Sequence, residues 1–453
     1  MNALLKRIFV ATLSGFFFTG IYAVPSVEIS PSAGFHAIKV VPERNSGLND
    51  MFVSYADGTV SVTYTSVNAG VTPKWYRYSS LGGGYAEEVS GVVTTGNSSI
   101  LEAAETDMGY IIEDGDSRYY FWIVGYLKHP LHLERVVLSD ESDCDRTVLN
   151  ITGQGDEIHY FGINGQRFTL DRQIEIDYKN LEWNDERSNF EQVDIVKNVQ
   201  SVSHPVLVSP PAYCPTIFTV SGDLFLREWN MEQTVVSGTY HPVAVDCRTT
   251  ATQTSTEGEN SNQIKGGTDG LGGSAPCEIT FEAFVTDAVI HTEWQMSSDS
   301  GFDNISYRLN GQDLTFTFRD EGTTYVRFVG SNSDGSCETY GETFTIDIGA
   351  SELKCPNAFS PGASEGVNDE WKVSYRSLIE FECWIFDRYG TQMYHFSDPA
   401  GGWDGRYKGK LVSPGVYYYV IKAKGSDGKE YKRGGDINIV RFKGRQGTGS
   451  SSE

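Results

Sequence analysis

The chain has 453 residues and a formal net charge of −24, with 36 Lys and Arg against 60 Asp and Glu. This length exceeds one typical domain, so we expect three or four domains, each with a modest core. The acidic balance disfavours nucleic acid and anionic lipid as partners, because both carry negative charge.

The first 23 residues have the layout of a secretory signal peptide. Lys6 and Arg7 precede an apolar run from Ile8 to Gly20, and a small residue, Ala23, marks the expected cleavage site. The apolar run is too short to span a bilayer comfortably. We therefore expect an exported protein with no membrane-spanning segment after removal of the signal.

Seven cysteines follow the expected cleavage site, without a CxxC pair or a Cys/His cluster. In an exported chain such cysteines are typical of disulfides rather than of metal ligands. We expect no cofactor and no metal. Because seven is odd, at least one thiol must stay unpaired.

Short alternating runs cut by Gly, Asn, Asp and Pro predict antiparallel strands and turns throughout the mature chain. Lys74–Tyr78 is such a run: Tyr76 and Tyr78 share one side and Trp75 faces the other. An exposed Tyr pair would suit sugar stacking, but core packing is the favoured interpretation. The fold class is all-β, with β-sandwich domains in tandem. The predicted parts are β-sandwiches over 24–140 and 144–252, a Ser/Thr/Gly-rich flexible linker over 253–276, β-sandwiches over 277–350 and 355–443, and a flexible tail over 444–453.

An Asn-Gly pair lies between alternating runs in two of these domains, within Ile163–Leu170 and within Leu309–Phe316. Asn-Gly favours a type I′ turn, which needs positive φ at both residues, so each pair predicts a β-hairpin. A shared domain plan or convergent turn chemistry would both explain the repetition.

The third domain resembles the immunoglobulin-like or PKD-type sandwich of bacterial surface proteins. Trp294 lies between Cys277 and Cys337, and a Tyr/Val/Phe strand in 323–336 ends in a Gly/Asn/Asp-rich tip. The Trp-Asp-Phe-Gly-Asp-Gly core of PKD repeats is replaced by Glu293–Ser297, so the resemblance implies a fold and no function. It also implies a Cys277–Cys337 bridge, which would stabilise the sandwich by roughly 3–4 kcal/mol.

The last domain carries a longer series of motifs. The motif residues are Phe359, Ser360, Pro361, Asn368, Asp369, Arg388, Gly390, Gly402, Trp403, Asp404, Gly405, Pro414, Gly415 and Tyr417. In this order, they resemble the gliding-motility-associated C-terminal domain, the type B sorting domain of the type IX secretion system of Bacteroidetes. The family's acidic turn after Phe-Ser-Pro is replaced by Gly362–Gly366, which puts in doubt any ion that relatives bind there.

The resemblance implies delivery to the cell surface or the extracellular space, with the type IX secretion machinery as a partner. One hypothesis is an adhesin or surface structural element that also contacts other surface or envelope proteins. The alternative is an accessory of the secretion or gliding apparatus, docked on a PorP/SprF-like outer-membrane barrel and retained in the periplasm or at the outer membrane.

The charge is divided unevenly along the chain. Residues 24–354 carry 20 basic and 48 acidic side chains, or −28, whereas 355–445 carry 14 and 11, or +3. A basic face would suit docking on an acidic or polar receptor, although basic edge residues also protect exposed strands from pairing. The docking candidates are Arg406, Lys408, Lys410, Lys422, Lys424, Lys432 and Arg433.

Two further disulfides are expected. Cys355 and Cys383 lie on plausible neighbouring strands of the last domain. Cys144 has two possible partners, Cys214 and Cys247. Cys247 is favoured because the bridge would join the first strand of the second domain to its last.

No catalytic constellation stands out. The histidines form no His-Glu-x-x-His run, and no Gly-x-Ser-x-Gly elbow appears in a suitable context. His129 and His132 flank a loop, where such pairs are usually incidental. The carboxylates of Glu182–Glu186 could be an acid/base pair, but acids on a polar stretch are usually solvated. We expect a non-enzymatic protein; a surface hydrolase is the least favoured class.

Overall fold

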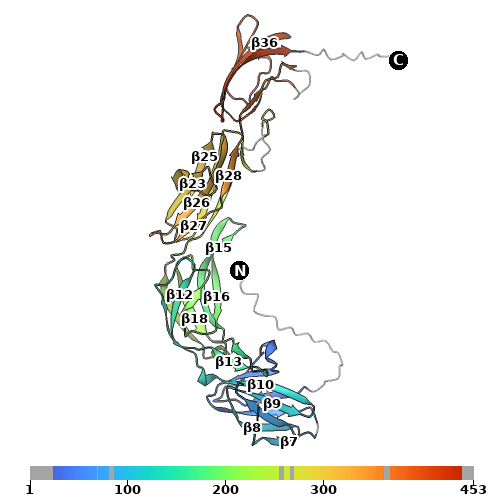
Figure 1. Ribbon diagram of the computed structural model, residues 1–453, viewed down its shortest axis with the longest axis vertical. Coiled ribbons are helices and arrows are strands. Elements are labelled where there is room, and N and C mark those ends of the chain that lie inside the picture. The colour runs from blue at the N-terminus through green and yellow to red at the C-terminus, as the bar shows by residue number, and fades with distance from the viewer. Residues whose placement is uncertain are drawn as a thin grey trace, which may run out of the picture.

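The computed structural model describes residues 24–68, 70–80, 86–254, 260–265, 270–361 and 368–440. The predicted signal peptide, the predicted tail 444–453 and the turn 362–366 lie outside these residues. The regular secondary structure of the described residues is almost entirely strand, so the predicted all-β class is confirmed. Four β modules follow one another along a long, curved body (Figure 1).

Module one packs two sheets face to face. The first has the order β1-β4-β8-β7: β1 (Ser26–Ile29), β4 (Thr59–Thr65), β8 (Ser98–Glu105) and β7 (Val93–Thr95). The second has the order β2-β3-β10-β9-β5-β6: β2 (Ile38–Val40), β3 (Asp50–Ser54), β10 (Ser117–Gly125), β9 (Met108–Asp114), β5 (Lys74–Tyr78) and β6 (Glu87–Glu88). The described residues of the module also include the 3₁₀ turns η1 (Arg44–Ser46) and η3 (Tyr126–Lys128).

The six-stranded sheet of module one is buried on both faces, which explains the nearly continuous apolar run in β10. Phe121 and Ile123 face the core between the two sheets. Trp122 and Val124 point the other way, into a core shared with module two. In β5, Trp75 enters the first core and Tyr76 and Tyr78 the second, as the strand's alternation predicts.

Module two places its strands around the same shared core. One sheet has the order β11-β12-β17: β11 (His132–Leu138), β12 (Thr147–Gln154) and β17 (Val206–Val208). A second is the pair β13 (Ile158–Phe161) and β14 (Arg167–Leu170). The third has the order β16-β15-β18-β19: β16 (Asn189–Val199), β15 (Ile174–Asn184), β18 (Thr216–Gly222) and β19 (Gln233–Tyr240). A short helix, α1 (Leu224–Glu228), follows β18. Because β11 pairs with β12, this strand belongs to module two rather than to the predicted first domain 24–140.

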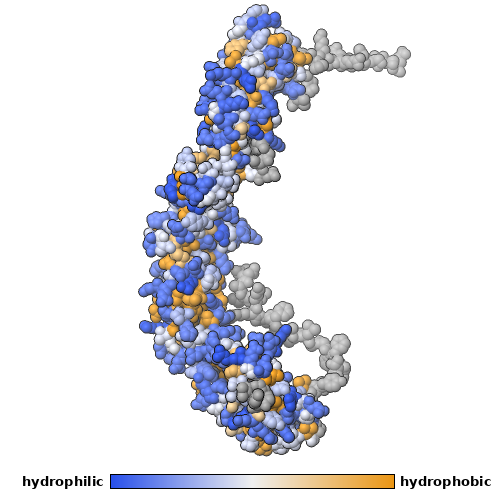
Figure 2. Space-filling model, in the orientation of Figure 1, coloured by the Kyte–Doolittle hydropathy of each residue, from blue (hydrophilic) through white to orange (hydrophobic). Residues whose placement is uncertain are grey.

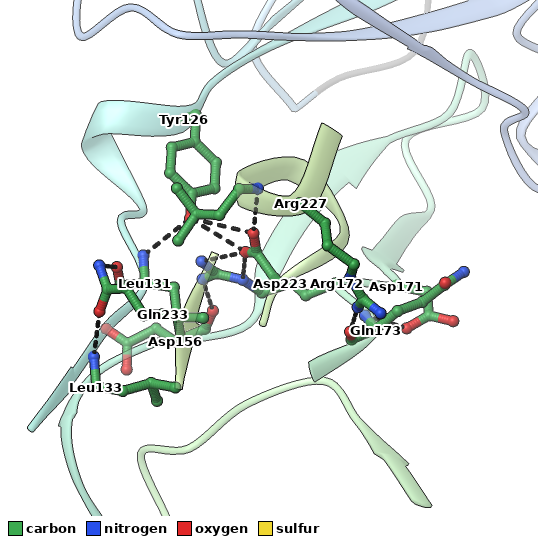
Figure 3. Close-up of polar contacts among 11 residues, drawn as sticks. Tyr126, Leu131, Leu133, Asp156, Asp171, Arg172, Gln173, Asp223, Arg227 and Gln233 are labelled. Atoms are coloured by element: carbon green, nitrogen blue, oxygen red, sulfur yellow. Dashed lines mark hydrogen bonds and ion pairs between the residues drawn. The ribbon is translucent and has the colours of Figure 1, made fainter. Parts of the chain in front are cut away.

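Tyr126 of module one bonds to a buried ion pair of module two, which ties the two modules together (Figure 3). Arg172 and Asp223 are fully buried, and Arg172 Nε donates to Asp223 Oδ2 over 2.9 Å. The hydroxyl of Tyr126, at the end of module one, donates to the same carboxylate over 3.2 Å. Burial and the Asp223 carboxylate raise the pKa of Tyr126, so its hydroxyl stays protonated. The indole of Trp229 also donates to the carbonyl of His36.

Module three is a sandwich of two sheets. One has the order β20-β22-β25: β20 (Cys247–Gln253), β22 (Cys277–Val285) and β25 (Asp313–Phe318). The other has the order β21-β28-β26-β23-β24, with β27 paired to β26: β21 (Leu271–Gly273), β28 (Phe344–Ile348), β26 (Gly322–Ser331), β23 (His291–Ser297), β24 (Ile305–Asn310) and β27 (Glu338–Tyr340). Trp294 lies fully buried in the core between them.

The two Asn-Gly pairs have different outcomes. Asn164-Gly165 lies in the turn between the paired strands β13 and β14, so this hairpin is confirmed. The hairpin at Asn310-Gly311 is wrong, because β24 and β25 belong to different sheets and the chain crosses the sandwich between them. The crossing places β25 beside β22, where Phe318 packs on Phe281 of the same sheet.

The predicted flexible linker is bonded in its described parts. Its first residue ends β20, and β21 pairs with β28 inside module three. Residues 260–265, which we name the strap, reach the last module: Asn262 Nδ2 donates to the carbonyls of Val373 and Pro399, and Ile264 N donates to Tyr375 O. The strap therefore connects modules three and four instead of separating them.

The disulfide pairing differs from every predicted bridge. Cys144 is joined to Cys337, 193 positions later. The Cys277–Cys337 bridge is wrong because the two residues lie at opposite ends of module three: Ser274 and Ala275, just before Cys277, bond to Ser377 of the last module, whereas Cys337 touches module two. The Cys144–Cys247 bridge is wrong because Cys144 is joined to Cys337, and Cys247 is a free thiol in the core of module three.

The remaining cysteines are free thiols: Cys214, Cys247, Cys277, Cys355 and Cys383. The predicted Cys355–Cys383 bridge is therefore not formed, although the two residues influence each other electrostatically. Burial raises the pKa of all five thiols, to about 11 at Cys277. A raised pKa lowers the thiolate fraction at neutral pH and with it the reactivity.

We expect the unreduced native protein to react slowly with iodoacetamide at pH 7, and five thiols to react once it is unfolded without reductant. Mass spectrometry of the alkylated chain counts them. Three alkylated thiols would show that Cys355 and Cys383 are bridged after all. Seven would show that Cys144 and Cys337 are not.

The last module contains a five-stranded sheet with the order β30-β37-β36-β32-β33 and two small pairs, β29-β31 and β34-β35. The bounds are β29 (Glu352–Lys354), β30 (Ala358–Phe359), β31 (Ser374–Arg376), β32 (Leu378–Phe386), β33 (Gln392–Phe396), β34 (Arg406–Tyr407), β35 (Lys410–Leu411), β36 (Gly415–Gly425) and β37 (Glu430–Ile439). One face of the larger sheet covers the core and the other is open to solvent.

Candidate functional site: the outer sheet face of the last module

The apolar motif residues of the last module build its core. Trp403 and Trp371 are fully buried and exchange two backbone hydrogen bonds of 2.8 and 3.0 Å. The Trp403 ring lies 5.6 Å from Phe359 and 5.3 Å from Tyr417. These residues therefore hold the module together and are not available to a receptor.

The polar and glycine motif residues form its turns. Gly405 has φ +73°, and a Cβ there would come within 3.0 Å of Pro361, so only glycine fits. Asp404 Oδ1 accepts from Arg406 N, and Ser360 N donates to Asn368 O. In the β32–β33 turn, which contains Arg388 and Gly390, the amides of Thr391 and Tyr389 hold the pKa of Asp387 below its usual range. The motif residues Asp369, Gly402, Pro414 and Gly415 lie in connecting segments or at a strand start.

The outer face of the five-stranded sheet is apolar at its centre. In β36, Tyr417, Tyr419 and Ile421 turn toward the core, so Val416, Tyr418 and Val420 point outward, with 41, 46 and 41% of their surface exposed. Across the ladder, Tyr418 lies opposite Phe386 and Val420 opposite Trp384. We name the set Trp384, Phe386, Val416, Tyr418 and Val420 the aromatic face.

Lysines border the aromatic face at one end. Lys422 lies between Lys432 on β37 and Glu382 on β32, and Lys432 Nζ pairs with Glu430 over 3.1 Å, so the glutamates partly offset the like charges of the two lysines. The Lys422 ammonium is 5.8 Å from the Trp384 ring centre, and this ring stacks on His395 at 5.3 Å. Lys424 lies between Glu380 and Glu430, which offset its charge. The face is thus aromatic, with a charged end where Lys422, Lys424 and Lys432 meet Glu380, Glu382 and Glu430, a composition suited to protein recognition.

The seven predicted docking residues separate into three groups. Lys422, Lys424 and Lys432 share the outer face. Arg406, Lys408 and Lys410 lie together on or between the small strands β34 and β35. Arg433 lies opposite Ile421, on the other side of the sheet.

Sequence reasoning missed the aromatic face itself. The run Gly415–Ile421 predicts a buried strand, yet alternate residues of this strand are exposed. Phe386 belongs to the run Ile385–Gly390, which we interpreted only as a family motif, and Trp384 precedes that run. A signal was present in the alternation of β36, but both of its rows are apolar, so the pattern does not say which row faces solvent.

The other candidate residues lie apart from one another. Glu182 and Glu186 are exposed near the tip of the β15–β16 hairpin. His129 contacts Asp107 over 3.2 Å and His132 is exposed at the start of β11. Over the described ranges, no three His, Cys, Asp or Glu side chains come together as a metal site. Within the same ranges, no helix is both long and apolar enough to cross a membrane.

Comparison with known families identifies two parts of the chain. Residues 353–438 match the model of the CHU_C type IX secretion signal domain. The last module is a type IX secretion signal domain. Residues 136–237, almost the whole of module two, match the model of the fibronectin type III domain. Both are non-enzymatic kinds of domain, and the expected resemblance to a sorting domain with immunoglobulin-like modules upstream is confirmed.

Comparisons over the whole chain add less. No curated protein matches. Among solved structures, the chain is similar to a tetra-tandem repeat from the extending region of a large adhesion protein, at 10% identity and a TM-score of 0.20, covering 84% of this chain and 96% of that one. It is also similar to a Ca²⁺-stabilized adhesin that helps an Antarctic bacterium bind ice, at 10% identity and a TM-score of 0.19, covering 92% and 99%. At these TM-scores neither likeness carries an argument about function.

Proposed function

We propose that the chain is a non-enzymatic cell-surface protein, carried across the outer membrane by the type IX secretion machinery through its secretion signal domain, and acting as an adhesin or surface structural element. The match of residues 353–438 to the secretion signal family carries the proposal. The type IX secretion signal domain indicates an exported cell-surface protein. The three modules before it form the part that is displayed.

The outer face of the signal domain is the proposed contact with the machinery. It combines exposed Tyr418, Val416 and Val420 with Lys422 and Lys432, which oppose each other on adjacent strands. Large aromatic side chains supply contact area at an interface, and Lys422 and Lys432 would exchange their glutamate partners for acidic or polar groups of the receptor. The acidic body of the chain would be repelled from the same receptor.

A truncation tests the role of the signal domain. In a Bacteroidetes host, we expect full-length protein to be digested when protease is added to intact cells, and a chain ending at Ala350 to remain protected in the periplasm. Protection of both forms, with co-purification of a PorP/SprF-like barrel, would favour the alternative role as an accessory of the secretion or gliding apparatus.

A charge-reversal set tests the outer face without removing the domain. The triple variant Lys422→Glu, Lys424→Glu and Lys432→Glu should reduce surface-exposed protein at least tenfold, because it replaces the ammonium groups of the proposed contact with carboxylates. The matched control is Arg406→Glu, Lys408→Glu and Lys410→Glu, which changes the same net charge on the β34–β35 hairpin. Equal export of both variants would remove the outer face from the proposal.

A further inference from the structure

The three joints between the modules are held in three different ways. Modules one and two share one hydrophobic core, with the buried Arg172–Asp223 pair inside it. Modules three and four are joined by the hydrogen bonds of the strap and of Ser274 and Ala275 with Ser377. Modules two and three are joined by the Cys144–Cys337 disulfide.

The noncovalent contacts at the joint between modules two and three are modest. The connector 241–246 has no regular secondary structure. Asn332 Nδ2 donates to Val243 O over 3.2 Å, and the rings of Trp183 and Phe284 lie 5.3 Å apart. The hydrophobic core of module three contains no residue from module two. The disulfide therefore lies at a joint where the apolar contact between modules is small.

The two cysteines also have particular places along the chain. Cys144 lies between β11 and β12, near the start of module two, and Cys337 lies between β26 and β27, near the end of module three. The bridge thus encloses 193 positions of sequence in one covalent loop. Most of module two and most of module three belong to this loop.

We propose that the Cys144–Cys337 disulfide carries tensile load past modules two and three. When the chain is pulled from its two ends, the continuous covalent path runs through module one and β11 to Cys144, across the sulfur atoms to Cys337, and on through β27 and β28 to the last module. Residues 145–336 are outside this path. They can lose their fold, but they cannot be drawn out to their extended length.

The proposal rests on the proposed function in one respect: a displayed adhesin or structural element, held at the cell surface through its last module, is pulled along its long axis (Figure 1). The path of tensile load through the disulfide, which we name the bypass, is itself a property of the covalent chain. A fully extended chain spans at most 3.3–3.6 Å per residue, so the 193 enclosed positions correspond to roughly 640–690 Å of length that pulling cannot release.

Single-molecule force spectroscopy tests the bypass. The mature chain from residue 24, with attachment tags at both ends, is stretched before and after addition of dithiothreitol, which reduces the bridge to two thiols. We expect the total length released on unfolding to increase by roughly 640–690 Å after reduction. The variant Cys144→Ser/Cys337→Ser should show the longer value without reductant, and Cys214→Ala, which changes a thiol outside the bridge, should still show the increase.

Other pairings give other lengths. A Cys277–Cys337 bridge would hide 60 positions, or roughly 200–220 Å, and a Cys144–Cys247 bridge 103 positions, or roughly 340–370 Å. Either increment, or none, overturns the proposal. If the Cys277–Cys337 and Cys144–Cys247 bridges formed together, their combined increment would approach that of the single Cys144–Cys337 bridge. Mass spectrometry of an unreduced digest distinguishes these two cases, because it identifies the linked peptides. Because stretching does not depend on cellular location, loss of surface export would contradict the proposed function and leave the bypass intact.

Discussion

Replacing Arg172 with methionine should lower the free energy of unfolding of the fused modules one and two by about 3–5 kcal/mol, as expected when one partner of a buried ion pair is removed. Both Arg172 and Asp223 have none of their side-chain surface exposed. The substitution leaves the Asp223 carboxylate in the core without a cation. It also removes the donor to the carbonyl of Asp156, which Arg172 Nη1 contacts over 2.8 Å.

Because Asp223 contacts residues of both modules, the loss of stability extends across the joint between modules one and two. Its carboxylate accepts from Tyr126 at the end of module one and from the amide of Leu226 in the first turn of α1. That turn leads to Trp229, whose ring packs on Tyr126 at 5.1 Å. An uncompensated charge at this point therefore disturbs the helix cap and the aromatic contact between modules together.

Urea titration followed by tryptophan fluorescence measures the change. The control is Lys179→Met, which breaks an exposed pair with Asp194 and should change stability by less than about 0.5 kcal/mol. Arg172→Met/Asp223→Asn removes the orphaned charge but keeps the Oδ1 acceptor, so it should recover part of the loss. A single variant no less stable than the control would show that the pair does not hold the joint.

How far the sequence predicts this molecule depends on whether a feature is local. The strands of module one follow from alternation, and the run of β10 also indicates burial on both faces. The run does not indicate what covers the second face of β10, because Phe161 of module two contacts Trp122 only after both modules fold. Arg172 and Asp223 likewise look like ordinary loop residues, since 51 positions separate them.

The disulfide pairing and the exposure of the aromatic face also depend on contacts between distant residues, so the sequence did not predict them. Pairing within a domain is a reasonable expectation when domain boundaries are known, but Cys144 and Cys337 belong to different modules that meet end to end. The signal domain was recognisable from its motifs because they form its core and turns. The aromatic face was not, because exposure in β36 depends on which side of the sheet Trp371 and Trp403 cover.

The surface of the molecule is mostly hydrophilic, with apolar side chains gathered over module two and again near the last module (Figure 2). An exposed apolar face and a buried core look alike in sequence. Mutations are therefore needed to distinguish residues that dock on a receptor from residues that stabilise the fold. In the signal domain, the outer-face lysines can be changed without touching the core. A change at Trp403, by contrast, alters the core without touching the outer face.

Replacing Trp403 with alanine should destabilise the secretion signal domain by about 3–5 kcal/mol, because it removes a large buried side chain and leaves a cavity. The ring is fully buried against Phe359 and Tyr417, and its nitrogen donates to Arg406 O over 2.9 Å. Since domains are commonly stable by only 5–15 kcal/mol, the loss removes a large share of the fold. Hydrogen exchange of peptides from β36 and β37 should quicken at least a hundredfold.

The same variant should stay inside the cell envelope, whereas the outer-face triple variant should be lost from the surface with normal hydrogen exchange. Tyr389→Ala, at a turn residue with 84% of its surface exposed, is the control and should leave exchange and export unchanged. If Trp403→Ala unfolds the domain and export continues, recognition reads an unfolded segment and not a face. If neither variant affects export, neither the fold of the domain nor its outer-face lysines are recognised. Only export that fails in both variants, for these two different physical reasons, supports recognition of a folded surface.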